Sequence, residues 1–288
     1  MLNKKALQSE MAVLLSMQEI VGAYEEIAAM RMRKVKKSVL QNRDFLSGLN
    51  NLYNRVWYTY LHERRVNALG FPVKRPESVF VGNGKTVSVL VSANTRLYGD
   101  IIKKTFDLFL KSIVDVETDI VVIGKLGRQF MSESGLNREY KAFDIADTAY
   151  EREDMKDVLD YILAYTNVIV YHGLYVSVLT QNPTKTLVTG QALDLKEGNV
   201  KDELRCLIEP STEEVAQFFE KQILSSVFEQ SMFESSLSKY ASRMISLDMA
   251  SDNISNYLKA ARFQTIKLRH LVNNIKQTER ISGIALWD

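Results

Sequence analysis

The amino-acid sequence predicts a long antiparallel two-helix coiled coil, formed by the two ends of the chain, with a small and mainly parallel α/β domain inserted between them. Three observations predict it. The ends of the chain lack proline, both ends carry an apolar repeat of coiled-coil type, and the middle alternates β-branched runs with helix-like stretches. We expect an N-terminal coiled-coil helix at 1–70, an α/β domain at 71–209 and a C-terminal coiled-coil helix at 210–288.

The N-terminal helix is predicted by what residues 1–71 lack and by what they repeat. They contain no proline, a residue that costs a helix interior about 3 kcal/mol. From Leu7 to Tyr60, alternating steps of four and three residues meet an apolar side chain at 13 of 16 positions. A repeat that averages 3.5 residues keeps one seam facing a partner when the helices supercoil left-handedly.

The C-terminal helix has a start signal and the same repeat. In "EPSTEEV" (209–215), Ser211 and Glu214 have the spacing of a capping box at a helix N-terminus. From Tyr240 to Ile275, nine of eleven seam positions are apolar. At about 1.5 Å per residue, a helix over 211–283 would be roughly 110 Å long. Each terminal helix is therefore the expected partner of the other.

Between the prolines at 76 and 210, the pattern changes to short strands and helices. We expect strands at 85–93, 118–125 and 167–173, with a weaker candidate at 184–193. Helix-like stretches lie at 100–112, 126–134 and 152–165. Because strand and helix alternate, the middle of the chain is predicted to be a small, mainly parallel sheet of the Rossmann-like kind.

Composition excludes several classes of protein. The 37 Lys and Arg nearly balance the 35 Asp and Glu, and a net charge of +2 gives no reason to expect a nucleic-acid partner. The single cysteine, Cys206, allows no intrachain disulfide. We expect no transmembrane segment, because no stretch approaches 20 uninterrupted apolar residues, and no signal peptide.

Two glycine-containing motifs resemble ligand loops without their full pattern. "GNGKT" (82–86) lacks the first glycine of a phosphate loop and precedes a strand instead of a helix, so we interpret it as a turn. "IGKLGRQF" (123–130) is interpreted as a strand-to-helix turn. The three histidines are scattered, and Cys206 has no histidine beside it. We therefore expect no catalytic constellation, no metal site and no cofactor.

The run "RMRKVKK" places five positive charges in seven residues on the N-terminal helix. Its cations are Arg31, Arg33, Lys34, Lys36 and Lys37. Two interpretations stay open, a solvated face of the coiled coil and a contact with an acidic partner.

Several motifs together resemble the gamma subunit of F-type rotary ATPases, the central shaft. "SKYASRMISLDMASDNI" (238–254) is similar to that family's E-H-A-A-R-M-V-A-M-D-N-A-T-D-N-A, and "ERISGIAL" (279–286) to its E-I-V-S-G-A-A-A-L. "EPSTEEV" matches its E-P-S-x-E-E-V, and "YHGLYVSVLTQNP" (171–183) resembles its Y-N-x-F-x-x-x-x-T-Q-x-P. "QEIVGAYEEIAAMRMRK" (18–34) is similar to its N-terminal helix. The matches keep their order along the chain.

The sequence also departs from that family's pattern. The motif D-R-G-L-C-G-G-L-N is reduced to "NTRLYGDII" (94–102), and the Met-Lys-Met of the first helix is Tyr24-Glu25-Glu26. In "LRHLVNNIK" (268–276), Arg269 is kept, whereas His270 and Lys276 stand where the family has glutamine and glutamate. The resemblance implies that these tip residues meet the catalytic subunits, so that contact is rewritten in this chain.

The resemblance implies a rotor shaft that couples ATP hydrolysis or synthesis in a ring of alpha and beta subunits to rotation. The shaft itself would be non-catalytic, and nucleotide and magnesium would bind the ring. The other partners implied are a small epsilon-type subunit and a membrane rotor ring or other machinery at the foot. The location implied is the cytoplasmic face of the cell membrane, as a peripheral part of a complex.

The resemblance also suggests which residues meet these partners. The residues expected to contact the catalytic ring are Tyr24, Glu25, Arg243, Asp248, Asp252, Asn253, Arg269, His270 and Lys276. The residues expected at the foot are Arg31, Arg33, Lys34, Lys36, Lys37 and Glu209.

The polar centre of the C-terminal helix, Ser251-Asp252-Asn253, has residues that favour caps over helix interiors. From the residues alone, Asp252 and Asn253 can be solvated neighbours of a small seam residue. The resemblance favours a further role, in which small Ser251 lets the helices approach and Asp252 and Asn253 make reversible polar contacts with the ring. We also expect the outer surface of the shaft to be polar, since large apolar patches would adhere to the ring wall.

Two other functions stay open from the sequence. One is a gamma-like rotor of a divergent, hydrolysis-only motor attached to other machinery. The other is a coiled-coil scaffold with no motor. An α/β enzyme with helical arms would need convergent polar groups at the strand ends, which the sequence does not predict.

Overall fold

The computed structural model describes residues 4–67, 82–147, 153–189 and 208–284. The two predicted terminal helices are present as α1 (Lys4–Asn67) and α5 (Thr212–Ile284). The Ser211 hydroxyl oxygen accepts a hydrogen bond of 3.2 Å from the Glu214 N–H. This confirms Ser211 as the N-cap of α5, since the first N–H groups of a helix have no partner within the helix.

The described residues between α1 and α5 form five strands and three short helices. The order is β1 (Thr86–Val91), α2 (Ile101–Ile113), β2 (Asp119–Ile123), α3 (Lys125–Glu133), β3 (Lys141–Phe143), α4 (Lys156–Ile162), β4 (Asn167–Tyr175) and β5 (Gln181–Leu187). The sequence did not predict β3, which has three residues and no β-branched run. The expected fourth strand begins earlier, at Gln181, and residues 190–193 lie outside the described residues.

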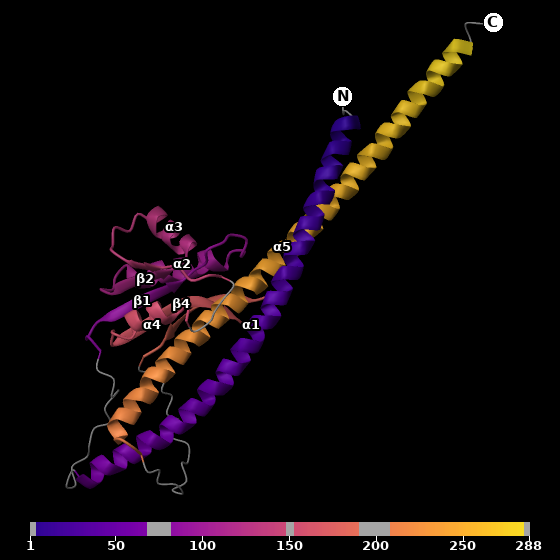
Figure 1. Cartoon of the computed structure of the whole chain (residues 1–288). Helices are drawn as coiled ribbons and strands as arrows, with labels where there is room; N and C mark the ends of the chain where they lie inside the picture. Colours follow the sequence, from indigo (N-terminus) through magenta and orange to yellow (C-terminus); the bar gives the residue numbers. More distant parts are fainter. Residues whose placement is uncertain (1–3, 68–81, 148–152, 190–207, 285–288) are drawn as a thin grey trace. The chain divides into compact units, whose positions relative to one another are not determined.

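The sheet has the order β3-β2-β1-β4-β5 (Figure 1). The pairs β1–β2, β1–β4 and β2–β3 are parallel, whereas β4 and β5 form an antiparallel hairpin. The prediction of a mainly parallel sheet is therefore confirmed. The chain builds outwards from β1 through β2 to β3 and then crosses back to β4, so the strand order reverses between β1 and β4.

Both faces of the sheet are covered, which explains why the central strands are almost continuously apolar. On one face, Val89 of β1 and Val170 of β4 belong to a core that includes Val158 of α4 and Phe228 of α5. On the other face, Leu90 packs with Phe106 and Phe109 of α2 and with Met131 of α3. Figure 1 shows α2 and α3 on one side of the sheet and α4 on the other.

The chain divides into two compact units, which are described separately. Unit 1 consists of Met1–Ala29 and Arg243–Asp288, and unit 2 of Met30–Ser242. Each unit contains one part of α1 and one part of α5, and unit 2 also contains the sheet. The three regions expected from the sequence have boundaries near the ends of α1 and α5. The boundaries of the compact units lie instead within these two helices.

In unit 2, the predicted seam of α1 packs against α5. Leu49, Tyr53 and Val56 form a buried cluster with Ala216 and Ile223. Polar pairs join the same helices. The Asn42 amide donates to the Ser226 carbonyl (3.1 Å) and to Gln230 Oε1 (3.0 Å), and the Tyr53 hydroxyl donates to Glu220 Oε1 (2.7 Å). Because residue numbers fall on α5 as they rise on α1, the pair is antiparallel.

Within unit 2, α5 is buried on nearly all sides, because it lies between α1 and the sheet. Its buried residues over 225–242 include many serines, at 225, 226, 231, 235, 236, 238 and 242. Small side chains let the helix approach the sheet closely. At Gly173 of β4, an added Cβ would lie 2.6 Å from Ser238 Oγ.

In unit 1, the two helices are also antiparallel. The Gln18 amide donates to the Ser255 hydroxyl (3.5 Å), and the Thr265 hydroxyl points to the Met11 sulfur (3.6 Å). The predicted seam of α5 is buried or half-buried up to Leu268. Beyond it, Val272 and Ile275 are 43% and 50% exposed, so the last part of the apolar repeat has no cover within the described residues.

Candidate functional site

The residues predicted to contact partners separate cleanly between the units. All nine residues expected to face the catalytic ring lie in unit 1, and all six expected at the foot lie in unit 2. In unit 1, most of them are exposed on the surface. The exposed ones are Tyr24, Asp248, Asp252, Asn253, Arg269, His270 and Lys276.

Two of the nine differ from the others. Glu25 is half-buried, as its position on the seam of α1 requires. Arg243 is only 7% exposed. Its guanidinium therefore offers little surface to a partner, and its contact with the ring stays a prediction.

The polar centre of α5 has the arrangement expected from the sequence. Ser251 is half-buried on the seam, while Asp252 and Asn253 are exposed. One helical turn on, Ser255 is half-buried and bonds to Gln18 of α1. The seam at this level therefore carries small and polar side chains, and the Asp252 carboxylate and the Asn253 amide lie on the exposed side of α5.

The expectation of a polar outer surface on unit 1 is wrong. A second apolar stripe runs along α1 with the same spacing of four and three residues. Each of its members immediately precedes a residue of the buried seam. The stripe consists of Val13, Met17, Ile20, Tyr24 and Ile27, which are 37% to 56% exposed. On α5, Met249, Tyr257 and Phe263 are 62% to 68% exposed. Apolar surface on this scale is typical of a protein that works inside an assembly.

The basic run of unit 2 lies on the outside of α1. Arg33, Lys34, Lys36 and Lys37 are exposed and Arg31 is half-buried, whereas Val35 between them is buried. Within the part of the chain that the structure describes, no salt bridge pairs any of the five cations with a carboxylate. Glu209, the other predicted foot residue, is exposed just before α5.

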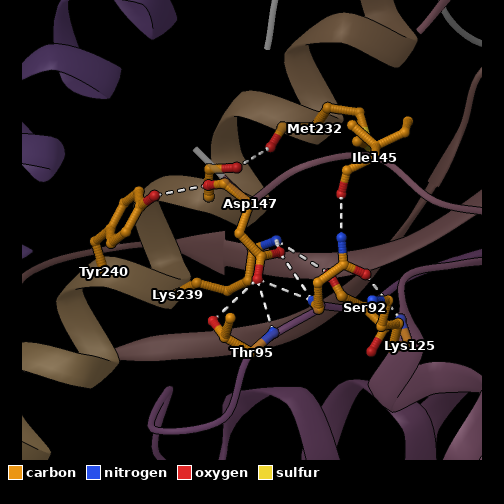
Figure 2. A network of polar contacts seen from close by, with 10 residues as sticks. Ser92, Thr95, Lys125, Ile145, Asp147, Met232, Lys239 and Tyr240 are labelled. Atoms are coloured by element: carbon orange, nitrogen blue, oxygen red, sulfur yellow. Dashed lines mark hydrogen bonds and ion pairs between the residues drawn. The ribbon is translucent and has the colours of Figure 1, made fainter. Parts of the chain in front are cut away.

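The sequence did not predict a buried polar cluster that joins α5 to the sheet (Figure 2). Its centre is the Asp147 carboxylate, which follows β3. This carboxylate accepts hydrogen bonds from the Asn94 N–H (2.9 Å), the Thr95 N–H (2.9 Å) and the Thr95 hydroxyl (3.1 Å). The Asn94 side chain is held in turn, since its amide donates to the Ile145 carbonyl (2.7 Å) and its oxygen accepts from the Lys125 N–H (2.9 Å).

Two consecutive residues of α5 complete this cluster. The Lys239 ammonium donates to the Ser92 carbonyl (3.0 Å) and lies 3.8 Å from Asp147 Oδ1. The Tyr240 hydroxyl donates to the Asp147 carbonyl (2.7 Å). The side chains of Lys239 and Asp147 are only 4% and 6% exposed. The one sequence signal was a lysine within the small and apolar run "SSLSKYAS" (235–242).

This cluster lies where doubly wound α/β domains bind ligands. Such domains bind them outside the carboxyl ends of the strands, at the point where the strand order reverses. Ser92 and Asn94 follow β1, and Asp147 follows β3. In this chain the position is filled by Lys239, a side chain of α5. The polar groups that an α/β enzyme would need at the strand ends here contact that helix.

The two glycine motifs are turns, as predicted. Gly84 of "GNGKT" has a φ of 77°, and the Asn83 side-chain oxygen accepts a hydrogen bond from the Lys85 N–H (2.9 Å) just before β1 begins. Gly124 links β2 to α3 with a φ of 96°, and an added Cβ there would lie 2.9 Å from the backbone of Ala93.

Among the described residues, no group of three or more His, Cys, Asp or Glu is arranged to hold a metal ion. None of the described helices is both long and apolar enough to cross a membrane.

Solved structures with the same fold come from rotary ATP synthases. A chain of the central stalk and c-ring structure of Tetrahymena thermophila mitochondrial ATP synthase superposes with a TM-score of 0.54 at 15% identity, over 81% of this chain and 99% of that one. A chain of Euglena gracilis mitochondrial ATP synthase gives 0.53 at 13% identity, over 88% and 93%. The fold is that of the central stalk of a rotary ATP synthase.

Sequence comparison identifies the family. The family model described as ATP synthase matches residues 3–272, and the chain belongs to that family as a gamma-type member. It is 24% identical to the ATP synthase gamma chain of Ruthia magnifica subsp. Calyptogena magnifica, over 98% of both chains. It is 21% identical to the gamma chain of Vesicomyosocius okutanii subsp. Calyptogena okutanii, over 97% of both. The predicted resemblance to the gamma subunit is confirmed.

Proposed function

We propose that this chain is the central rotor shaft of an F-type rotary ATPase and that it catalyses no reaction itself. The observation that carries the proposal is the pairing of the two chain ends as antiparallel helices, in a chain that matches the gamma family over nearly its whole length. The burial of Lys239 at the ligand position of the sheet supports a mechanical role, because the usual place for a substrate is filled.

The partners of unit 1 are alpha and beta subunits arranged as a ring. The second apolar stripe of α1 provides surface to pack against the ring wall, and Asp252 and Asn253 provide polar contacts. Since the two helices differ in sequence, each catalytic subunit meets a different face of the shaft. If each face favours a different conformation of that subunit, nucleotide occupancy and shaft angle become coupled free energies.

The partners of unit 2 are a small epsilon-type subunit and a membrane rotor ring or other machinery. The five cations of the basic run, with no salt bridge among the described residues, suit a partner that carries acidic groups. On this proposal the complex lies at the cytoplasmic face of the cell membrane, with this chain as a peripheral subunit.

A second candidate is a rotor in a motor that only hydrolyses ATP. It is favoured by His270 and Lys276, which are exposed on α5 at positions where the family pattern has glutamine and glutamate. A changed contact with the ring at these positions would suit a motor whose work is delivered elsewhere than in ATP synthesis.

Native purification of the tagged full chain tests these proposals. We expect alpha- and beta-type ATPase subunits to copurify, identified by mass spectrometry, with azide-sensitive ATP hydrolysis in the preparation. Copurification of a membrane rotor ring and ATP synthesis in energised vesicles would favour a synthase. Hydrolysis without synthesis would favour the second candidate. Recovery of the chain alone, or with partners that include no ATPase, would overturn the rotor.

A further inference from the structure

The contacts of Lys239 and Tyr240 with Ser92 and Asp147 are directional polar contacts between α5 and the α/β domain. We refer to these contacts as the α5 latch. Elsewhere in unit 2, α5 meets the sheet through apolar side chains such as Phe228 and Met232 and through small serines. Apolar and small-residue contacts resist separation, but they depend weakly on direction. Hydrogen bonds and ion pairs are lost within a small change of distance or angle.

The burial of the latch makes its geometry strict. A lysine ammonium and an aspartate carboxylate that are about 95% buried persist only if each has partners, because desolvation of an unpaired charge is costly. Turning α5 by one residue would move Lys239 by about 100° around the helix axis. That rotation would leave the Asp147 carboxylate and the Ser92 carbonyl without the ammonium.

The latch also reaches the surface of the α/β domain. Asp147 binds the backbone N–H groups of Asn94 and Thr95, at the start of the loop between β1 and α2 (Figure 2). In this loop, Leu97 has a φ of 74° and is 60% exposed. A leucine in the left-handed region is strained and persists only where its surroundings hold it. The same carboxylate therefore binds α5 and anchors a strained, exposed loop.

We propose that the α5 latch locks α5 to the α/β domain against rotation and thereby transmits torque between the shaft helix and that domain. Lys239 acts as an internal ligand in the crevice at the carboxyl ends of the strands, and Asp147 is the positioning residue that couples it to the loop. The inference rests on the proposed rotor function, because torque passes through this contact only if the chain turns within a ring.

A rotation assay on the assembled ATPase complex tests the latch. A bead is attached to the α/β domain through Ser132→Cys, at an exposed position of α3, in a Cys206→Ser background. The quantity measured is the angular variance of the bead during the pauses between steps. Lys239→Met keeps the length of the side chain and removes its charge. We expect it to raise the variance at least twofold, because a directional restraint between α5 and the domain is lost, while the rate of ATP hydrolysis changes less than twofold.

Two further variants and a control complete the experiment. Lys103→Met removes an exposed lysine of α2, which pairs with Asp107, and should leave the variance unchanged. Tyr240→Phe removes one hydrogen bond of the latch and should raise the variance less than Lys239→Met does. If Lys239→Met does not assemble, Tyr240→Phe and Lys239→Arg carry the test.

The outcomes separate the latch from the rotor. Unchanged angular variance in all assembled latch variants overturns the latch, even where their stability is lower. A contact that only stabilises the fold would change stability without changing the angular variance. Absence of ATP-driven rotation in the unaltered complex overturns the proposed function instead.

Discussion

At the scale of single residues, the α/β domain depends on positions where a helix and a strand come unusually close. Gly173 of β4 faces α5, and its lack of a side chain leaves room for Ser238. One residue earlier, His172 is 1% exposed, and its Nε2 lies 2.9 Å from the Thr186 hydroxyl. Gly173 thus brings β4 close to the part of α5 within unit 2, whereas the His172 contact joins β4 to β5.

Gly173→Ala should destabilise the chain. The new Cβ would lie 2.6 Å from Ser238 Oγ and 3.0 Å from Ile101 Cγ1, so α5 or β4 must move. We expect a loss of about 1–3 kcal/mol in the free energy of unfolding, measured by urea denaturation of the full chain. Adding Ser238→Ala should restore part of it. Gly48→Ala is the matched control, since nothing lies within 4 Å of the added Cβ. Equal stability of the Gly173 and Gly48 variants would contradict the close approach.

His172 should make the folded chain sensitive to mild acid. Burial lowers the pKa of its imidazole below the usual value of 6.5, although hydrogen bonding to the Gly173 carbonyl and the nearby Glu234 carboxylate oppose the shift. Below pH 6.5 the unfolded chain therefore binds a proton that the folded chain does not. The stability that neutral His172 contributes is complete above pH 6.5 and is lost as pH falls towards the folded pKa.

The measurement is the free energy of unfolding between pH 7.5 and 5, for the full chain and for His172→Gln. We expect the slope of the unaltered chain to be steeper below pH 6.5, by at most about 1.4 kcal/mol per pH unit. Other titrating groups contribute equally to both proteins and cancel in the difference. Parallel curves would show that His172 is protonated equally in the folded and unfolded chains.

At the scale of elements, the terminal helices were predictable from the sequence, and the structure shows that polar residues of their seam make hydrogen bonds between the helices. Every described seam position from Leu7 to Val56 is buried or half-buried. Two of the three polar exceptions to the apolar repeat of α1 make hydrogen bonds to α5. Gln18 bonds to Ser255 in unit 1, and Asn42 to Ser226 and Gln230 in unit 2. A polar residue in a coiled-coil seam favours the register in which its partner is opposite.

Asn42→Ala should weaken the pairing of α1 with α5 in unit 2. It removes two hydrogen bonds and leaves the Gln230 side chain and the Ser226 carbonyl without the Asn42 donor. Because unsatisfied buried groups cost about 1–3 kcal/mol, we expect a loss of that size in urea denaturation. Gln41→Ala, at an exposed position one residue earlier, should change stability by less than about 0.5 kcal/mol. A loss at Gln41 as large as that at Asn42 would argue against a register role.

At the scale of the whole molecule, the two compact units have different surfaces. Unit 1 exposes an apolar stripe, a polar centre and residues 269, 270 and 276 of α5, whereas unit 2 exposes the basic run and contains the sheet. This division suits a shaft whose one part turns within a catalytic ring and whose other part is joined to different machinery. The polar centre of α5 is the feature of unit 1 whose contribution is simplest to measure.

Replacing Asp252 and Asn253 together by alanine should slow the assembled motor. Polar contacts worth about 0.5–1.5 kcal/mol in the rate-limiting orientation correspond to a roughly two- to tenfold lower rate of ATP hydrolysis, with lower torque in a bead assay. Both side chains are exposed, so the helix itself should fold normally. Asn256→Ala, at a nearby exposed position, is the control. Full torque in the double variant would contradict a contact between the polar centre and the ring.

The sequence predicted the elements because their signals are local. Absence of proline, a 3.5-residue repeat, a capping box and β-branched runs each act within a few turns or one strand, so α1, α5, β1, β2 and β4 could be expected from the chain alone. The three residues of β3 could not, because they are too few to carry a period and become a strand only by pairing with β2. The order and motifs of the chain also predicted its family.

Tertiary structure alone decided how the elements are joined. Asn94, Asp147 and Lys239 are far apart in the sequence, and nothing in the local context of any of the three names the other two. They meet because parallel strands bring their carboxyl ends to one edge of the sheet and because α5 passes over that edge. Burial there turns a lysine that would be solvated on a surface helix into a fixed contact. Sequence patterns report local conformation, whereas the energy of a buried charge depends on neighbours that only the folded chain supplies.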